Sequence, residues 1–336
     1  MSDAGDDVPP ADTASTADTD TDPGFVAVGA ATVDRFYGVT NLPAPDGGAF
    51  AREVSERFGG VGANVATGVA RLGRDTALLA RIGDDDLGDR VLADLDDGPV
   101  STALIQRGPE TTTHCVILRG PEGERMIVTA GESTVALELD SPARETIRDA
   151  DAVFVTAYTP DSVTSEIVEI AAAPDGPALA FDLSGPIEEL EDRGTESSTI
   201  ERVIDVADLF ITAEVAAESH LDCPAEEAAD ALRERGCSRG AVTFGTDGAL
   251  LFDGQERTRI PAFDVDAVDT TGAGDAFTAA LTERWLLDAD DAGAAGRFAA
   301  ATAALNCRAP GARGGLPDES AVSAFLAERG NRPESC

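Results

Sequence analysis

The stretch that decides the fold is Asp-Thr-Thr-Gly-Ala-Gly-Asp-Ala-Phe at residues 269–277. A β segment ends before it, a Gly-rich turn follows, and an apolar helical pattern begins after the turn. The first N–H groups of a helix have no partner inside the helix. We therefore expect the N–H groups of Gly272, Ala273 and Gly274 to form an anion site, which the helix dipole strengthens. Glycine lets a phosphate approach the backbone without meeting a Cβ atom.

Asp275 lies inside this expected anion site, where a carboxylate is unsuitable as a ligand for phosphate. It is suitable as a base that accepts the proton of a hydroxyl group attacking the phosphate. Asp also caps helix N-termini well, so a purely structural role for Asp275 remains an alternative when the residues alone are considered.

A second Gly motif, Phe-Gly-Gly-Val-Gly-Ala-Asn-Val-Ala at residues 58–66, also opens a helical pattern. Asn64 lies one turn into that helix, on the same side as Gly59 and Gly60, and its amide can both donate to and accept from hydroxyl groups. The motif is not a dinucleotide fingerprint, because Val65 stands where the third Gly belongs. A tight turn before an amphipathic helix is the simpler alternative.

Short apolar β patterns alternate with helical patterns, which predicts an α/β fold with a mostly parallel, doubly wound sheet flanked by helices. Residues 36–58 interrupt the alternation and, with residues 113–129, predict a small β lid over one edge of the sheet. The expected strands are residues 25–29, 76–82, 100–105, 113–118, 125–129, 152–156, 178–182, 208–211, 240–244, 249–252 and 258–260. The expected helices are residues 61–72, 87–95, 162–173, 273–287, 293–307 and 319–328.

The chain is expected to hold one folded domain, residues 25–330, between two tails. Residues 1–24 contain seven Asp and no Arg, which predicts a disordered acidic tail. Residues 331–336 are expected to form a short C-terminal tail. The five Cys residues are widely spaced and form no CxxC pair, which favours reduced thiols over a zinc site.

The net charge of the 336-residue chain is −38, and all 25 of its basic residues are Arg. The absence of Lys excludes a P-loop and Schiff-base chemistry, and the negative field disfavours nucleic acid and anionic membranes as partners. Such self-repulsion is tolerated where high salt screens it, so the composition resembles that of proteins from extreme halophiles. No signal peptide or membrane-length apolar run is apparent, which predicts a cytoplasmic location.

The two Gly motifs, in this order and near these positions, resemble those of the ribokinase-like sugar kinases, also called the phosphofructokinase B type. The resemblance covers about residues 25–325 and implies transfer of the γ-phosphate of ATP to a hydroxyl of a small carbohydrate. It implies that Asp275 is the catalytic base and that residues 272–274 form the anion hole. The sugar-binding residues that it implies are Asp34, Gly59, Gly60 and Asn64, although Asp34 alone could equally mark a strand-end turn. The ATP-binding residues that it implies are Thr243, Gly245, Thr246, Gly248 and Gly311.

The resemblance also implies cations. Asp269 and Thr271 correspond to positions that bind a monovalent cation such as K⁺ in many members of the family. Members often carry Asn-x-x-Glu to place Mg²⁺, but this chain has Ala213 and Ala216 there, which leaves Glu214, or Asp182, to hold Mg²⁺ through water.

Other departures concern the substrate and the charges around it. Val61 replaces a Lys common in ribokinases proper, which argues against assuming ribose. Arg119, Arg125 and Arg308 are the evident cations left to neutralise phosphate, although most Arg residues of such a chain face solvent. His114, in the expected lid, is interpreted as a packed or solvated residue rather than a substrate contact.

Two alternative functions remain open at this point. A nucleoside kinase of the same fold would favour aromatic stacking groups, yet the expected lid offers only Phe36, Tyr37 and Phe50. A non-catalytic regulator that binds a sugar or nucleotide is the other alternative, and the intact Asp275 argues against it. An uncovered edge of the lid would favour pairing with a second copy, which predicts a homodimer through the lid while leaving the oligomeric state undetermined.

Overall fold

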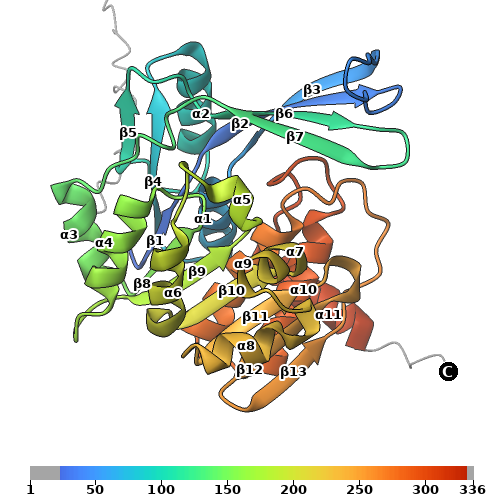
Figure 1. The fold of residues 1–336 in the computed structure, drawn as a ribbon. Helices are drawn as coiled ribbons and strands as arrows, with labels where there is room; N and C mark the ends of the chain where they lie inside the picture. The colour runs from blue at the N-terminus through green and yellow to red at the C-terminus, as the bar shows by residue number, and fades with distance from the viewer. Residues whose placement is uncertain (1–22, 331–336) are drawn as a thin grey trace, which may run out of the picture.

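The computed structural model describes residues 23–330, so all but the last two residues of the predicted tail 1–24, and the whole predicted tail 331–336, lie outside the described residues. A nine-stranded sheet runs through the large layer of the fold, with helices on both faces (Figure 1). Its strands, in order across the sheet, are β13 (Glu256–Ile260), β12 (Ala249–Asp253), β11 (Arg239–Thr243), β10 (Leu209–Ala213), β9 (Ala178–Leu183), β8 (Ala152–Thr156), β1 (Phe25–Val28), β4 (Thr76–Gly83) and β5 (Ile105–Gly108). Only the β11–β12 and β12–β13 pairs are antiparallel, which confirms the predicted doubly wound α/β fold.

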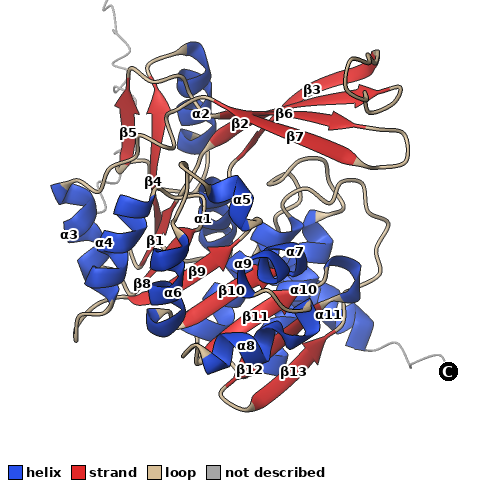
Figure 2. Cartoon of the chain, viewed as in Figure 1, coloured by secondary structure: helices blue, strands red, loops and turns tan. Residues whose placement is uncertain are grey.

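Side chains of one strand alternate between two cores. In β1, Phe25 and Ala27 belong to one hydrophobic cluster, whereas Val26 and Val28 belong to the other. Helices α1 (Val61–Arg71), α2 (Asp86–Asp96), α9 (Ala273–Leu281), α10 (Ala292–Asn306) and α11 (Glu319–Gly330) cover the first cluster. Helices α3 (Ser141–Asp149), α4 (Asp161–Ala171), α5 (Ile187–Leu190), α6 (Ser197–Val206), α7 (Glu214–Leu221) and α8 (Ala228–Glu234) cover the second (Figure 2).

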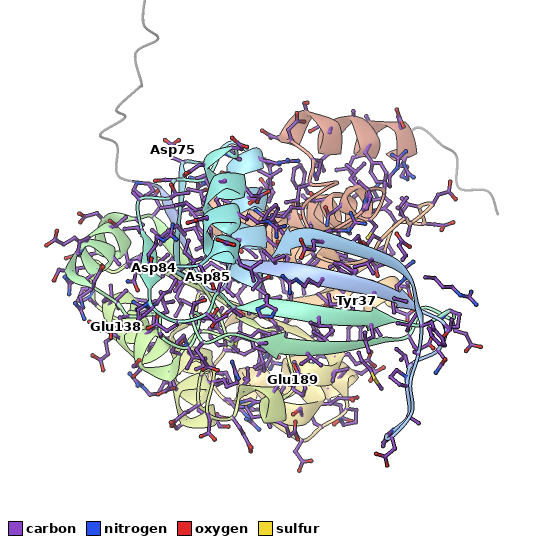
Figure 3. All side chains as sticks on the ribbon, turned by 90° about the horizontal axis from the view of Figure 1, so that it is seen from above. Tyr37, Asp75, Asp84, Asp85, Glu138 and Glu189 are labelled. Atoms are coloured by element: carbon purple, nitrogen blue, oxygen red, sulfur yellow. The ribbon has the colours of Figure 1, made fainter. Side chains whose placement is uncertain are left out.

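A second sheet of four strands projects from the carboxyl-end side of the large sheet and is the predicted lid (Figure 1). Its order is β3 (Ala51–Gly59), β2 (Thr32–Val39), β6 (His114–Arg119) and β7 (Arg125–Ala130). Strand β2 begins four residues before the expected lid boundary at residue 36, so Asp34 belongs to the lid. The ladder sets Asp34 opposite Arg57 on one side and opposite Cys115 on the other. Seen from above, the lid strands lie across the molecule (Figure 3).

Two expected elements differ from the structure. Residues 100–105 are not a strand: β5 begins at Ile105, and only Ser101 forms an isolated bridge, to Ala77. The buried Val100 gave that segment its apolar signal without pairing in a ladder. The expected helix 273–287 is α-helical only to Leu281 and continues as a π-helix over Thr282–Leu287, a change of hydrogen bonding that apolar periodicity does not reveal.

Candidate active site

The candidate site lies at the carboxyl ends of β1, β8 and β9, beneath the lid. The chain winds from β1 outward to β4 and β5, then returns to the other side of β1 with β8, so the winding direction reverses between β1 and β8. Ligands of open α/β sheets bind at such switch points. Three carboxylates converge here: Asp34 from the lid, Asp182 from the end of β9, and Asp275 from the first turn of α9.

The turn before α9 is shaped by Gly272, whose φ of 73° is a left-handed conformation. A Cβ on Gly272 would lie 2.4 Å from the Ala312 carbonyl oxygen, so only glycine fits against the loop of residues 309–314. Gly274 faces open space, with no atom within 4 Å of its Cβ position.

One N–H group of the predicted anion hole has an acceptor within the turn. The Ala273 N–H donates to the Thr270 carbonyl oxygen at 3.2 Å and is therefore not free. Among residues 23–330, no acceptor is present for the N–H groups of Gly272, Gly274 and Asp275. The donors available at the start of α9 are thus Gly274 and Asp275, together with Gly272, rather than Ala273.

Asp275 is paired with Asn64 across the interface between α1 and α9. The Asn64 Nδ2 donates to the Asp275 Oδ2 at 2.6 Å. Burial raises the pKa of Asp275 to about 6, the Asn64 bond opposes that rise, and the charge of Asp34 adds to it. The Asn64 Oδ1 is buried without a partner among the described residues. A buried acceptor without a partner is costly, so this atom is available to a hydrogen-bond donor.

Asp34 is 8% exposed and accepts a hydrogen bond from the Thr32 Oγ1 at 3.1 Å. Burial raises the pKa of Asp34, while Thr32 and the Cys115 thiol partly offset that effect. Gly59 makes room for this carboxylate, because a Cβ there would lie 2.3 Å from the Asp34 Oδ2. The structure therefore brings together Asp34, Gly59 and Asn64 as the resemblance implied.

Asp182 is more central than the sequence indicated, where it was only an alternative for holding water. It is 7% exposed and accepts a hydrogen bond from the Ser184 hydroxyl. Burial, together with the negative charge of Asp275, raises the pKa of Asp182 to about 7. An acidic residue ending a buried strand was the signal that could have placed it here.

Cys115 and Tyr158 were missed as neighbours of the site. Burial raises the pKa of the Cys115 thiol to about 11, and the adjacent Asp34 charge contributes. The Tyr158 hydroxyl donates to the Glu189 Oε2 at 2.8 Å, and burial raises the Tyr158 pKa. Cys115 reaches Asp34 through cross-strand register, which the sequence alone does not reveal.

The residues expected to bind ATP lie beyond β10, at the end of β11. Thr243 ends that strand, and its Oγ1 donates to the Thr212 carbonyl oxygen at 3.4 Å. Gly245 and Gly248 have φ values of 58° and 88°, and both Gly245 and Thr246 are exposed. This exposed strand-to-turn segment leaves backbone groups accessible to a nucleotide.

Asp269 links the turn of residues 270–274 to the loop of residues 309–314. Its Oδ1 accepts from the Thr271 N–H at 3.0 Å and from the Thr271 Oγ1 at 2.7 Å, and its Oδ2 accepts from the Gly311 N–H at 3.0 Å. These hydrogen bonds outweigh burial and hold the pKa of Asp269 below its usual value. Both carboxylate oxygens already have protein partners, so binding of a monovalent cation at Asp269 and Thr271 stays a prediction.

No group of three or more His, Cys, Asp or Glu side chains within residues 23–330 is arranged to hold a metal ion. Glu214, the first residue of α7, is exposed and forms no ion pair with a described residue. A magnesium ion that takes most of its ligands from phosphate and water is compatible with this arrangement. In the part of the chain that the structure describes, no helix is long and apolar enough to cross a membrane.

The remaining polar candidates lie elsewhere. Arg119 and Arg125 face each other at the exposed far end of the lid hairpin, and Arg308 is exposed after α10. His114 is half-buried, with its Nδ1 3.0 Å from the Thr112 carbonyl oxygen. None of these residues contacts the carboxylates described above through a hydrogen bond or ion pair.

Comparison with known proteins places this geometry in a family. The model of the pfkB family carbohydrate kinases matches residues 23–319. An ATP-dependent ribose-1-phosphate kinase of Halopiger xanaduensis is 32% identical, over 87% of this chain and 94% of the relative. The ribokinase of Bacillus subtilis is 28% identical, over 80% of this chain and 87% of the relative. The structure of Arabidopsis thaliana ribokinase complexed with ribose and ATP superposes with a TM-score of 0.78 at 26% identity, over 91% and 99% of the two chains.

Proposed function

The chain belongs to the pfkB family of carbohydrate kinases, and on that premise we propose that it phosphorylates a five-carbon sugar or sugar phosphate with ATP. The observation that carries this proposal is the Asn64–Asp275 pair, a base with a pKa of about 6 beside an orphaned amide oxygen. A base of that pKa is mostly ionised at neutral pH and still basic enough to take a proton in the transition state.

Each residue of the site has a proposed task. Asp275 accepts the proton of the attacking hydroxyl, and Asn64 holds both that carboxylate and the substrate. Asp34, with the backbone at Gly59 and Gly60, binds the other sugar hydroxyls. The free N–H groups at Gly274 and Asp275 face the transferred phosphate and stabilise its charge without Lys.

The nucleotide is proposed to lie along the segment from Thr243 to Gly248, with Gly311 at its far end. Magnesium bound with ATP would supply positive charge at the phosphates. In the absence of Asn-x-x-Glu, we propose that Asp182, and the exposed Glu214 across the end of β10, bind water molecules of that ion.

Substrate choice is testable with three acceptor classes. We would incubate the protein in molar KCl with magnesium, ATP and ribose, ribose 1-phosphate or a nucleoside, and measure ADP release. The proposal predicts the highest kcat/KM with ribose or ribose 1-phosphate, because relatives named for these substrates align over most of the chain. Preference for a nucleoside would instead favour the nucleoside kinases among its relatives. Absence of turnover with every acceptor would favour a non-catalytic regulator.

We also propose a homodimer through the outer face of the lid. Val54, Met126 and Val128 are 59%, 48% and 60% exposed there, on the face opposite Asp34. Exposed apolar groups in such number favour association. Sedimentation should show a dimer that Val128→Glu dissociates, whereas Val268→Glu, at an equally exposed position outside the lid, leaves it intact. A monomeric wild type would overturn this assignment.

A further inference from the structure

A cleft of about 420 Å³ adjoins the proposed nucleotide position at Gly311. We call it the arginine cleft. It is bounded by the end of β3, one side of α1, the end of α2 and the loop of residues 309–314, and Arg57, Arg71 and Arg313 line it. Of the residues assigned above to substrates, only Gly311 contributes to its wall.

The charge of the arginine cleft has the opposite sign to that of the chain. Its lining holds three arginines against two aspartates, Asp94 and Asp97, within a chain of net charge −38. An Arg313 Nη atom lies 2.9 Å from an Asp94 carboxylate oxygen, and the Arg71 Nη1 donates to the Leu316 carbonyl oxygen at 2.5 Å. An excess of positive charge in so acidic a protein indicates a place for an anion.

Although its charge helps to lower the pKa of Asp269, Arg57 is one of the two lining arginines, with Arg71, that have no carboxylate of the described residues in direct contact. It forms no ion pair with any carboxylate within residues 23–330. Its side chain is half-buried and lies along Gly311, with its Cδ 2.7 Å from the position that a Cβ of Gly311 would occupy. The guanidinium is also 5.9 Å from the centre of the Phe36 ring, so the stem is held on two sides.

Arg313 is a buried cation whose cost of burial is only partly offset by a nearby negative charge. Its side chain is only 12% exposed. Burial lowers the pKa of Arg313, and the Asp94 carboxylate offsets that effect only in part. A desolvated guanidinium gains more from an added anion than one in water does.

The loop of residues 309–314, which lines the cleft, also contacts the turn of residues 270–274. Gly311 donates its N–H to Asp269 at 3.0 Å, and the Ala312 carbonyl lies against Gly272. A ligand that restricts the motion of this loop would therefore also restrict the start of α9, because the loop contacts it in these two places.

From these observations we propose that the arginine cleft is an anion-binding site for a phosphate group, beside the substrate site, and that its occupation orders the 309–314 loop. Phosphate suits it better than chloride, because guanidinium groups bind phosphate oxygens in pairs. The group could arrive as inorganic phosphate or as a phosphate ester. The proposal does not require kinase activity, so its tests are independent of the proposed function.

The first test is calorimetric titration in molar KCl, without ATP or sugar, using inorganic phosphate and, separately, glycerol 3-phosphate. Saturable binding of either probe supports the site, and the probe that binds more tightly identifies free phosphate or an ester as the ligand. Arg57→Gln should weaken binding at least tenfold, and Arg57→Lys should restore part of it. Arg52→Gln, an exposed change of the same charge on the same strand, should leave binding unchanged.

A variant that is expected to tighten phosphate binding controls for misfolding, because a misfolded protein would only bind more weakly. Asp94→Asn removes a negative charge from the cleft and releases Arg313, so it should tighten phosphate binding at least threefold. Amide hydrogen exchange should show phosphate-dependent protection of residues 309–314 in the wild type and not in Arg57→Gln. No binding by the wild type, or equal binding by Arg57→Gln and the wild type, would overturn the proposal. Phosphate held only at the start of α9 would give the second of these results.

Discussion

Replacing Asn64 by leucine should move the acidic limb of the pH–rate profile to higher pH. The base must be ionised to accept a proton, so kcat/KM of the wild type should fall as the pH drops below about 6, the pKa of Asp275. The Asn64 Nδ2 stabilises that ionised carboxylate through a 2.6 Å hydrogen bond. Leucine has a similar size but no amide, so burial and the Asp34 charge then act on Asp275 unopposed.

The size of the shift follows from the lost bond. A hydrogen bond to a charged group contributes about 1.5–3 kcal/mol, and one pKa unit corresponds to about 1.4 kcal/mol. The limb should therefore rise by about 1 to 2 pH units. Loss of the Asn64 contact to the substrate also lowers the maximum of kcat/KM, but a lower maximum does not change the pH at which kcat/KM begins to fall.

The assay is ADP release at several pH values, at constant ionic strength and subsaturating sugar. Thr67→Val is the matched control, because Thr67 lies one turn further along α1 and its Oγ1 donates at 2.7 Å to Ala63 within the same helix. Its limb should stay near that of the wild type. An unmoved limb in Asn64→Leu, or an equal shift in both variants, would refute the assignment of Asp275 as a base tuned by Asn64.

Four further outcomes are expected. Asp275→Asn should lower kcat by more than about 100-fold while ATP still binds, because the proton acceptor is lost; near wild-type turnover would contradict its role. Gly272→Ala should destabilise the protein by about 1–3 kcal/mol, whereas Gly274→Ala, whose Cβ position is open, should not, as measured by denaturant unfolding. Folding raises the pKa of Asp182 from 3.8 to about 7, so the folded state binds more protons and the free energy of unfolding should fall as the pH rises through that window. Asp182→Asn should make the free energy of unfolding depend less on pH between about 4 and 7, and an unchanged dependence would argue against a raised pKa of Asp182. Dialysis from molar KCl into dilute buffer should unfold the protein, because the self-repulsion of a chain with net charge −38 is then unscreened. Circular dichroism would monitor the unfolding, and an unchanged ellipticity would contradict this expectation.

The strands of the large sheet were predictable because they are buried on both faces. Residues 76–82, 178–182 and 249–252 are near-continuous apolar runs, and the three strands that they form begin at the expected residues. The lid was harder to delimit, because one of its faces is solvent-exposed and its strands mix charged and apolar residues. Its β2 begins at Thr32 rather than near residue 36.

The individual residues of the site could be predicted from the sequence, but the contacts between them could not. The two Gly motifs identified Asn64 and Asp275 separately, yet the bond between them joins residues 211 positions apart. The orphaned Asn64 oxygen and the raised pKa of Asp182 depend on burial, which only the packed structure provides. The bond from the Ala273 N–H to the Thr270 carbonyl likewise depends on how the turn closes, which the sequence does not show.

The acidity of the chain and the chemistry of its site are connected. A lysine-free chain of charge −38 has few cations for phosphate, and most arginines near its surface already pair with carboxylates. The start of α9 offers N–H groups without an acceptor in the described residues, and hydrogen bonds from such groups to a phosphate would act at contact distance and lose little in high salt. Exposed lysines would lose most of their long-range attraction under the same screening. Backbone recognition, together with the few arginines that are partly buried, is therefore the arrangement best suited to bind phosphate under the high-salt conditions that this composition predicts.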